Sequence, residues 1–397
     1  MRILFVCGAD FSAPSEKQAL GFAQELVRRG HRVLISMGGD LDSAGTEGAI
    51  EISGLQFIRH RLRAYGRRLG APEIQSARNF RPTLIHSFSP RLPVITAAAA
   101  YSGATDAPVF VHYEDDEWSI ARGAPGEQLH RRAGRPVLRQ LGRVLPRAWP
   151  FQSAASERWI ATRARGIDAL TPALAEHVAE RVGRHVEVVL PVTPAVEKTA
   201  PGADLIDAGG VPVLLYTGAV FGSHIADFRL GLRAVALAQQ KGCSARLVHA
   251  GALAPRFDPA DLVRESGLRP GTAQFLGHLP FSAMPRLLAA ADVLLQPGHP
   301  SDFNRLRLPS KLQSYLASGT PTVTFAVGFG ELLADRREVL KTYTGDPQEL
   351  AARILELLEH EPLRRILAHA GPVAARRLFD PAQNTDVLLA HYDRCTI

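Results

Sequence analysis

The sequence of 397 residues is poor in cysteine and has no long apolar segment. Its cysteines, Cys7, Cys243 and Cys395, lie far apart, with no spacing typical of a metal site or a disulfide framework. We therefore expect a reducing, cytoplasmic compartment. No apolar run of about eighteen residues occurs, so no transmembrane helix is predicted. The opening run RILFVCGA is too short and wrongly flanked for a secretory signal, and it predicts a buried strand.

Acidic residues are outnumbered, and the formal net charge is +7. Residues 122–165 contribute much of the basic excess, with ten arginines against two glutamates. A basic patch attracts anions such as a phosphorylated substrate, acidic lipid headgroups or nucleic acid. Within it, residues 135–149 separate apolar and arginine positions onto two faces of a helix, which packs either on its own domain or on an anionic membrane. No recognition motif or aromatic interleaving supports nucleic acid as the partner.

The length of the chain exceeds what one hydrophobic core usually supports, which predicts two domains. Residues 2–36 predict a strand, a loop, a helix and a second strand, and this βαβ unit implies a parallel sheet. The same alternation restarts after a proline-rich stretch. We predict an N-terminal domain at 1–190, a linker at 191–204, a C-terminal domain at 205–371 and a final helix at 372–397.

One stretch of the second half contains the sequence signals of a strand, a loop and a helix in direct succession. Residues 292–296 predict a buried strand, and a loop rich in proline, glycine and serine follows at 297–310. Residues 309–317 predict a helix with Ser310 as its N-cap, before a strand at 322–325. Ligands bind at such loops in open α/β sheets, at the carboxyl ends of the strands.

The run PSKLQSYLASGTPTV in this stretch resembles the donor-sugar segment of GT-B glycosyltransferases of the retaining family 4. The resemblance implies an α/β fold of two Rossmann-like, doubly wound parallel-sheet domains that face a central cleft. It also implies that the N-terminal domain binds the acceptor, that the C-terminal domain binds a nucleotide-diphosphate sugar, and that the final helix crosses back to the first domain. Neither a catalytic metal nor another cofactor is expected.

Donor-site candidates follow from charge and backbone geometry. Lys311, at the start of the 309–317 helix, combines its charge with the helix dipole and would stabilise a departing diphosphate. Gly218 follows the first strand of the second domain and allows a phosphate to approach the backbone. The other candidates are polar or basic neighbours, whose alternative roles are capping or solvent exposure: Ser223, His224, Arg305, Arg307 and Ser310.

The sequence departs from the family pattern at two positions. Family members carry two glutamates separated by seven residues, the second of which binds the nucleotide ribose. Aligned on the shared run, these positions hold Leu306 and Ser314. A serine still hydrogen-bonds a ribose hydroxyl, though more weakly than a carboxylate. A divergent subfamily, a different nucleotide geometry and a loss of catalysis all remain open.

An acidic cluster follows the predicted strand at residues 109–112. By the resemblance, His112, Glu114 and Asp115 are the candidates for contacting the acceptor hydroxyl or the reacting sugar. A magnesium or manganese site is one alternative for the cluster, and a solvated helix cap is another for Asp116 and Glu117. Further acceptor-site candidates lie in the first loop, where helix capping is the alternative role: Asp10, Ser12 and Ser15.

Together these patterns predict a glycosyltransferase that acts in surface polysaccharide, glycolipid or glycoside biosynthesis. The expected partners are a nucleotide sugar and an acceptor that is a sugar, a lipid-linked sugar or a small molecule, with peripheral binding to anionic membrane through residues 122–165 as a further hypothesis. An epimerase or phosphorylase of the same fold would turn over the donor without an acceptor. A non-catalytic sugar-nucleotide-binding or partner subunit would bind without turnover.

Overall fold

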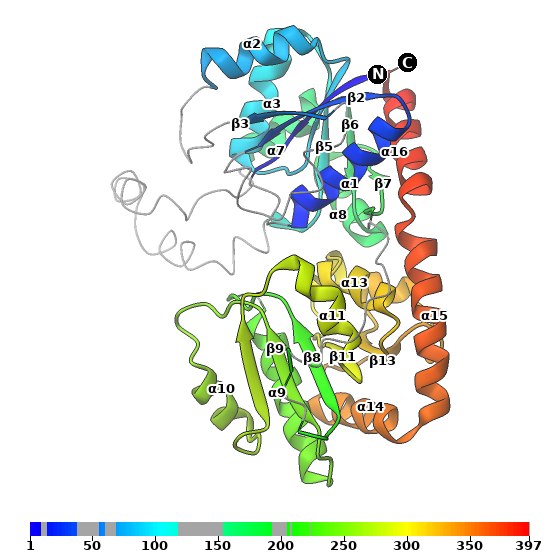
Figure 1. The fold of residues 1–397 in the computed structure, drawn as a ribbon. Helices are drawn as coiled ribbons and strands as arrows, with labels where there is room; N and C mark the ends of the chain where they lie inside the picture. Colours follow the sequence, from blue (N-terminus) through cyan, green and yellow to red (C-terminus); the bar gives the residue numbers. More distant parts are fainter. Residues whose placement is uncertain are drawn as a thin grey trace. The chain divides into compact units, whose positions relative to one another are not determined.

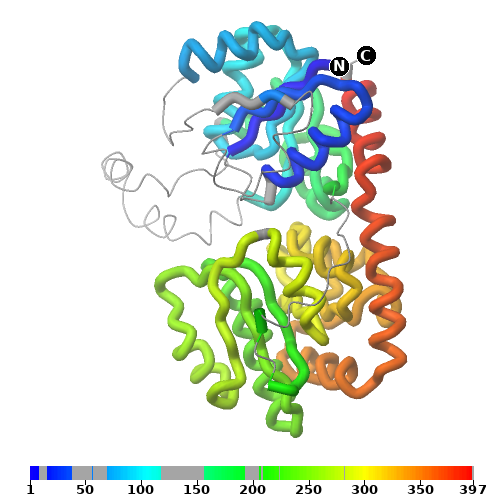
Figure 2. The backbone as a smooth tube through the Cα atoms, in the orientation of Figure 1, coloured from blue at the N-terminus to red at the C-terminus, as the bar shows by residue number. Residues whose placement is uncertain are grey.

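The structure is a computed structural model that describes residues 1–8, 14–37, 55–59, 69–117, 154–192, 205–206, 209–222 and 224–396. The chain forms two compact units, one of residues 1–194 with 380–397 and one of residues 195–379 (Figure 1 and Figure 2). The predicted start of the returning segment at residue 372 is wrong, because Pro372 lies inside helix α15 (Glu361–Phe379). The helix ends before Pro381, whose ring disfavours a helical Asp380.

The first unit contains a seven-stranded parallel sheet in the order β3-β2-β1-β4-β5-β6-β7. The strands are β1 (Arg2–Val6), β2 (Arg32–Met37), β3 (Leu55–Arg59), β4 (Leu84–Ser87), β5 (Val109–Tyr113), β6 (Gly166–Ala169) and β7 (Glu187–Val188). The helices are α1 (Pro14–Arg28), α2 (Ala71–Phe80), α3 (Leu92–Thr105), α7 (Ala154–Arg163), α8 (Pro172–Val182) and α16 (Pro381–Thr396). Helices α1 and α16 lie side by side and share a core with β1, built by Phe5, Phe22, Leu26, Leu388 and Tyr392 (Figure 1).

The second unit contains a six-stranded parallel sheet in the order β10-β9-β8-β11-β12-β13. The strands are β8 (Val213–Thr217), β9 (Arg246–Ala250), β10 (Ala273–Gly277), β11 (Val293–Gln296), β12 (Thr322–Phe325) and β13 (Leu340–Thr342). Besides α15, the α-helices are α9 (Ile225–Gln240), α10 (Pro259–Ser266), α11 (Met284–Ala289), α12 (Asp302–Leu306), α13 (Ser310–Ser318) and α14 (Pro347–Glu359). Short 3₁₀ turns occur at Phe281–Ala283 and Gly328–Leu332.

The strand order reverses beside the first strand of each sheet, between β1 and β4 and between β8 and β11. Open α/β sheets bind their ligands at the carboxyl ends of the strands where this reversal occurs. In the second unit, the loops that leave this edge begin at Gly218 and Pro297. The topology therefore brings the segment that follows β8 and the segment that follows β11 to the same edge of one sheet.

Some local predictions differ from the structure. Ser310 is the first residue of α13 and not its cap, because Pro309 takes the extended N-cap conformation. The stretch at 297–310, predicted as a loop, contains α12, which Ser301 caps by accepting a hydrogen bond from the Asn304 backbone N–H. The predicted basic helix at 135–149 lies outside the described residues. Among the described helices, none combines the length and apolar character required to cross a bilayer.

Candidate functional site

Lys311 lies in the first turn of α13, the helix that opens at the carboxyl edge of the second sheet. Its Nζ lies 3.6 Å from the centre of the Tyr216 ring, which packs at the end of β8. Burial lowers the pKa of Lys311 well below its ordinary value, and the charge of Arg307 lowers it further against an opposing effect of Asp227. An anion bound beside Nζ would reverse this shift, because it favours the charged amine.

Gly218 shapes the space that Lys311 occupies. Its φ of +104° is strained for any residue with a Cβ, and an added Cβ would lie 3.3 Å from the Lys311 Cε. The Gly218 carbonyl accepts a hydrogen bond from His249 Nε2 at 3.0 Å. The structure thus brings together Gly218 and Lys311, two candidates that are 93 positions apart in the sequence.

His224 stands immediately before α9, at its N-cap position. Burial lowers the pKa of His224 to about 4, and the charges of Arg307 and Lys311 add to the shift. The imidazole is therefore neutral near pH 7 and offers a hydrogen-bond donor without adding charge. Ser223, the neighbouring candidate, lies outside the described residues.

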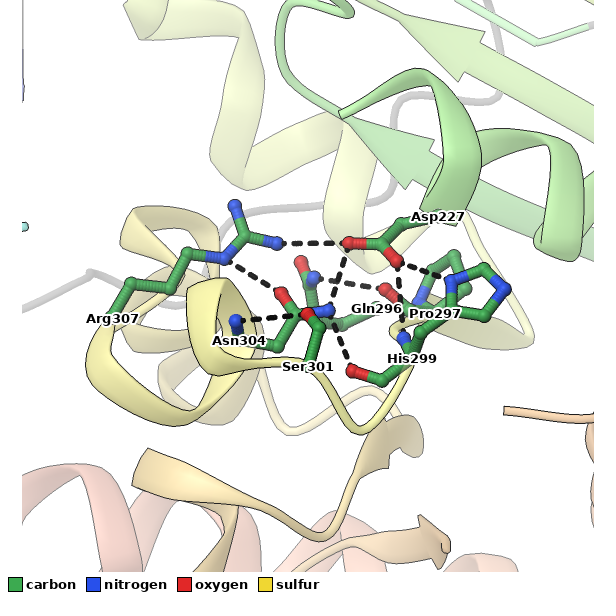
Figure 3. A network of polar contacts seen from close by, with 7 residues as sticks. All are labelled: Asp227, Gln296, Pro297, His299, Ser301, Asn304 and Arg307. Atoms are coloured by element: carbon green, nitrogen blue, oxygen red, sulfur yellow. Dashed lines mark hydrogen bonds and ion pairs between the residues drawn. The ribbon is translucent and has the colours of Figure 1, made fainter. Parts of the chain in front are cut away.

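A buried carboxylate organises the loop that precedes α13. Asp227 Oδ1 accepts hydrogen bonds from the His299 backbone N–H at 3.1 Å and lies 2.8 Å from the His299 Nδ1 (Figure 3). Asp227 Oδ2 accepts from the Asn304 amide at 3.0 Å and lies 3.2 Å from an Arg307 guanidinium nitrogen. Asn304 also donates to the His299 carbonyl and accepts from Arg307 Nε. This network fixes α12 and the chain that enters α13 against the start of α9.

The two candidate arginines differ in their surroundings. Arg307 is 7% exposed, engages Asp227 and Asn304, and lies 4.3 Å over the Phe303 ring. Arg305 is exposed and lies 3.5 Å from Asp302, its helical neighbour. Arg307 therefore stabilises the loop network as well as contributing positive charge near Lys311.

The two positions that hold other residues in place of the family glutamates differ in their burial. Leu306 is buried at the end of α12, where a leucine serves packing. Ser314 lies one turn after Lys311 on α13 and is half-buried. Ser310, at the start of the same helix, is exposed.

In the first unit, His112 lies on β5 and is buried, with only 1% of its surface exposed. Its Nδ1 hydrogen-bonds Asp168 on β6, its direct partner in the sheet register. His86 on β4 places Nε2 3.0 Å from the other oxygen of the same carboxylate. Sequence patterns missed Asp168, because its partners are far away along the chain and it follows no acidic motif.

The acidic residues after β5 are not a solvated cap. Asp116 and Glu117 are buried, and Glu117 pairs with Arg91 at 2.9 Å. Burial raises the pKa of Glu117, and Arg91 opposes that change. Glu114 and Asp115 are half-buried.

The acceptor candidates of the first loop are not tested by this structure. Asp10 and Ser12 lie outside the described residues. Ser15 belongs to α1, but its side chain is outside the described part.

His86, His112 and Asp168 form the one group of described residues with ligand atoms close enough to hold a metal ion, within 4.8 Å of one another. Two ligands of a tetrahedral ion are about 3.3 Å apart, given metal–ligand bonds of about 2 Å. The His112 Nδ1 and the Asp168 carboxylate are closer than this and share a hydrogen bond. The group therefore fits a hydrogen-bonded cluster better than a metal site.

Comparisons with known families cover both units. Residues 15–193 match the glycosyl transferase 4-like domain, and residues 211–360 match glycosyl transferases group 1. The chain belongs to the group 1 glycosyltransferases.

This glycosyltransferase is 28% identical over 253 residues to a 2-deoxystreptamine glucosyltransferase of Streptomyces kanamyceticus. The match covers 60% of this chain and 63% of that protein, which is less than two thirds of its length.

Solved structures show that the glycosyltransferase has the predicted GT-B fold. HepE of Anabaena in complex with UDP-glucose has a TM-score of 0.69 at 18% identity, covering 99% of this chain and 100% of its own. A glycosyltransferase from Rickettsia africae scores 0.65 at 13% identity, covering 100% and 98%. WaaG, a glycosyltransferase involved in lipopolysaccharide biosynthesis, scores 0.62 at 16% identity, covering 98% and 99%.

Proposed function

We propose that this glycosyltransferase moves a hexosyl group, with retention of configuration, from a nucleoside diphosphate sugar bound by the second unit to an acceptor bound by the first. The observation that carries the proposal is the position of Lys311 beside Gly218, at the N-terminus of a helix and at the carboxyl edge of the sheet. Among the described residues, no ion pair engages the Lys311 ammonium. A diphosphate would supply its missing counter-charge.

The surrounding groups suit the same ligand. The first backbone N–H groups of α13 have no partner within the helix, and the helix dipole favours negative charge at this end. His224 adds a neutral hydrogen-bond donor, and Gly218, which has no side chain, leaves room for the Lys311 side chain beside it. These groups would stabilise the charge that develops on the departing diphosphate. No metal ion is required in this scheme.

We propose UDP-glucose as the first donor to examine. HepE was solved with UDP-glucose, and the curated relative is a glucosyltransferase. We further propose an acceptor that is a sugar, a lipid-linked sugar or a small molecule comparable to 2-deoxystreptamine. These acceptors correspond to surface polysaccharide, glycolipid or glycoside biosynthesis.

A thermal-shift panel of nucleotide sugars tests the donor site. A donor at about 100 times its Kd should stabilise the folded protein by about 2.7 kcal/mol. Lys311→Ala should abolish most of this shift. Lys241→Ala is the matched control, because Lys241 is exposed at the opposite end of α9 from His224. The donor-site proposal fails if no donor shifts the wild type, or if the two variants lose the shift equally.

A second candidate is a subunit that binds a sugar nucleotide without turning it over. Leu306 and Ser314, in place of the family glutamates, favour it. Release of UDP from a bound donor in the presence of an acceptor panel distinguishes the two. Transfer to an acceptor supports the transferase, UDP release or donor conversion without any acceptor supports an epimerase or phosphorylase, and binding without turnover supports the subunit.

A further inference from the structure

A chain of polar contacts crosses three strands and the last helix of the first unit. The Tyr392 hydroxyl on α16 lies 2.6 Å from His86 Nδ1, and His86 Nε2 lies 3.0 Å from Asp168 Oδ2. Asp168 Oδ1 in turn hydrogen-bonds His112 Nδ1. All four side chains are buried, so solvent does not satisfy them. Each contact therefore constrains the protonation of the next group.

The carboxylate sets the direction of these hydrogen bonds. Burial raises the pKa of Asp168, but the two imidazoles outweigh this effect and hold its pKa well below the usual range. An ionised carboxylate only accepts hydrogen bonds. The nitrogen that hydrogen-bonds it, His112 Nδ1, must therefore carry a proton. An imidazole whose only proton is on Nδ1 has an acceptor at its other nitrogen, Nε2.

The far nitrogen of His112 points to a ligand. Nε2 is buried and has no hydrogen-bond partner among the described residues. A buried polar atom without a partner is unfavourable, and a histidine kept only for packing would gain from a partner or an apolar substitute. A hydroxyl that donates to Nε2 would remove this penalty. Sugars present many such hydroxyls.

We propose that Asp168 is a positioning residue for the transfer reaction, holding His112 with its proton on Nδ1 so that Nε2 accepts a hydrogen bond from a sugar hydroxyl of the donor or the acceptor. The inference rests on the proposed function, since a sugar is the ligand. His86 and Tyr392 complete the arrangement by orienting the second oxygen of the carboxylate. Asp168 itself contacts no substrate in this scheme.

Nitrogen NMR of the imidazoles in the full-length protein tests the tautomer without reference to activity. The wild type should show His112 with its proton on Nδ1. Asp168→Asn should reduce that population, because an amide can donate to Nδ1 where the carboxylate cannot. A wild type with the His112 proton on Nε2 would overturn the proposal. Near-stoichiometric zinc bound to the purified protein would also overturn it, because the cluster would then be a metal site.

Kinetics of the same variants test the role in transfer. Asp168→Asn should lower kcat by about tenfold or more. In a His112→Gln background it should cause little further loss, because both changes remove the same hydrogen bond. Tyr101→Phe is the matched control, since it removes a buried hydroxyl that pairs with Ser36 at 2.7 Å in the same unit, away from this cluster. An increased KM for the acceptor alone would identify the acceptor as the source of the hydroxyl, and an increased KM for the donor would identify the transferred sugar.

The outcomes separate the two proposals. A wild type without transfer to any acceptor contradicts the proposed function. A wild type that transfers sugar, with Asp168→Asn as active as Tyr101→Phe when both are folded, contradicts only the positioning role. Additive losses in the Asp168→Asn/His112→Gln double variant would also contradict it, since they indicate independent structural effects.

Discussion

The ammonium nitrogen of Lys311 lies 3.6 Å from the centre of the Tyr216 ring. The ring face attracts the cation and partly offsets the loss of water around it. Burial and the neighbouring Arg307 nevertheless lower the pKa of Lys311. In the unliganded protein the amine is therefore easier to deprotonate than an exposed lysine, which gives donor binding a measurable proton linkage.

Donor binding should take up a proton at Lys311. The uptake is expected between the lowered pKa of the free protein and the higher pKa of the complex, and it should vanish at pH values below the first or above the second. Titration calorimetry in buffers of different ionisation enthalpy measures it. Lys311→Arg is the control, because an arginine stays protonated throughout. Equal uptake in wild type and Lys311→Arg would show that another group takes the proton.

Gly218→Ala should weaken donor binding as well as stability. The left-handed backbone alone costs about 1–2 kcal/mol for a residue with a Cβ, and the new methyl would also press on the Lys311 Cε. Gly242→Ala provides the matched comparison, since its φ is +93° with nothing within 4 Å of the added Cβ. Both variants should unfold at lower temperature, and only Gly218→Ala should raise the donor Kd. An unchanged Kd would mean that Gly218 serves the turn alone.

Asp227→Ala should destabilise the second unit by about 3 kcal/mol, because it leaves the buried Arg307 without its carboxylate. Asp302→Ala removes an exposed carboxylate from an ion pair in α12 and should cost less than about 1 kcal/mol. Chemical denaturation compares the two. The donor Kd should rise for Asp227→Ala, since the network of Figure 3 holds the chain that leads into α13. Equal losses of unfolding free energy in the two variants would contradict the role of Asp227 in stabilising this network.

Ser314→Ala tests whether the serine replaces the missing glutamate. Loss of one hydrogen bond to a ribose hydroxyl should raise the donor Kd by about fivefold, equivalent to about 1 kcal/mol. The loss should disappear for donors that lack the ribose hydroxyls, measured in turn with the 2′-deoxy and 3′-deoxy nucleotide sugars. An equal increase in Kd with every donor would show that Ser314 stabilises the helix and does not bind the ribose.

The fold was predictable because its signals are local. Apolar runs such as residues 2–7 predict the strands, and the helix predicted at 309–317 agrees with α13 to within one residue at each end. Helix α12 was missed because five residues carry too little periodicity to distinguish a short helix from a loop. Thr171 shows the opposite case, because a threonine directly before a proline is a local signal for a helix start, and Thr171 caps α8.

The site was predictable only where one element determines it. Lys311 follows from its place at a helix start, whereas Tyr216 and Asp227 act through contacts with residues that are 72–95 positions away. The sequence pointed to His112 but not to Asp168, because the partner comes from the next strand of the sheet. Such pairs depend on register, which no local pattern specifies.

The first unit also has a consequence for how the protein is made. Its core requires α16, which carries Leu388 and Tyr392 onto the sheet after the whole second unit has been synthesised. The second unit is one continuous segment, and its core needs no residue of the first unit. The first unit cannot complete its core until α16 has been made, so the unit that is begun first depends on a segment that follows the second unit.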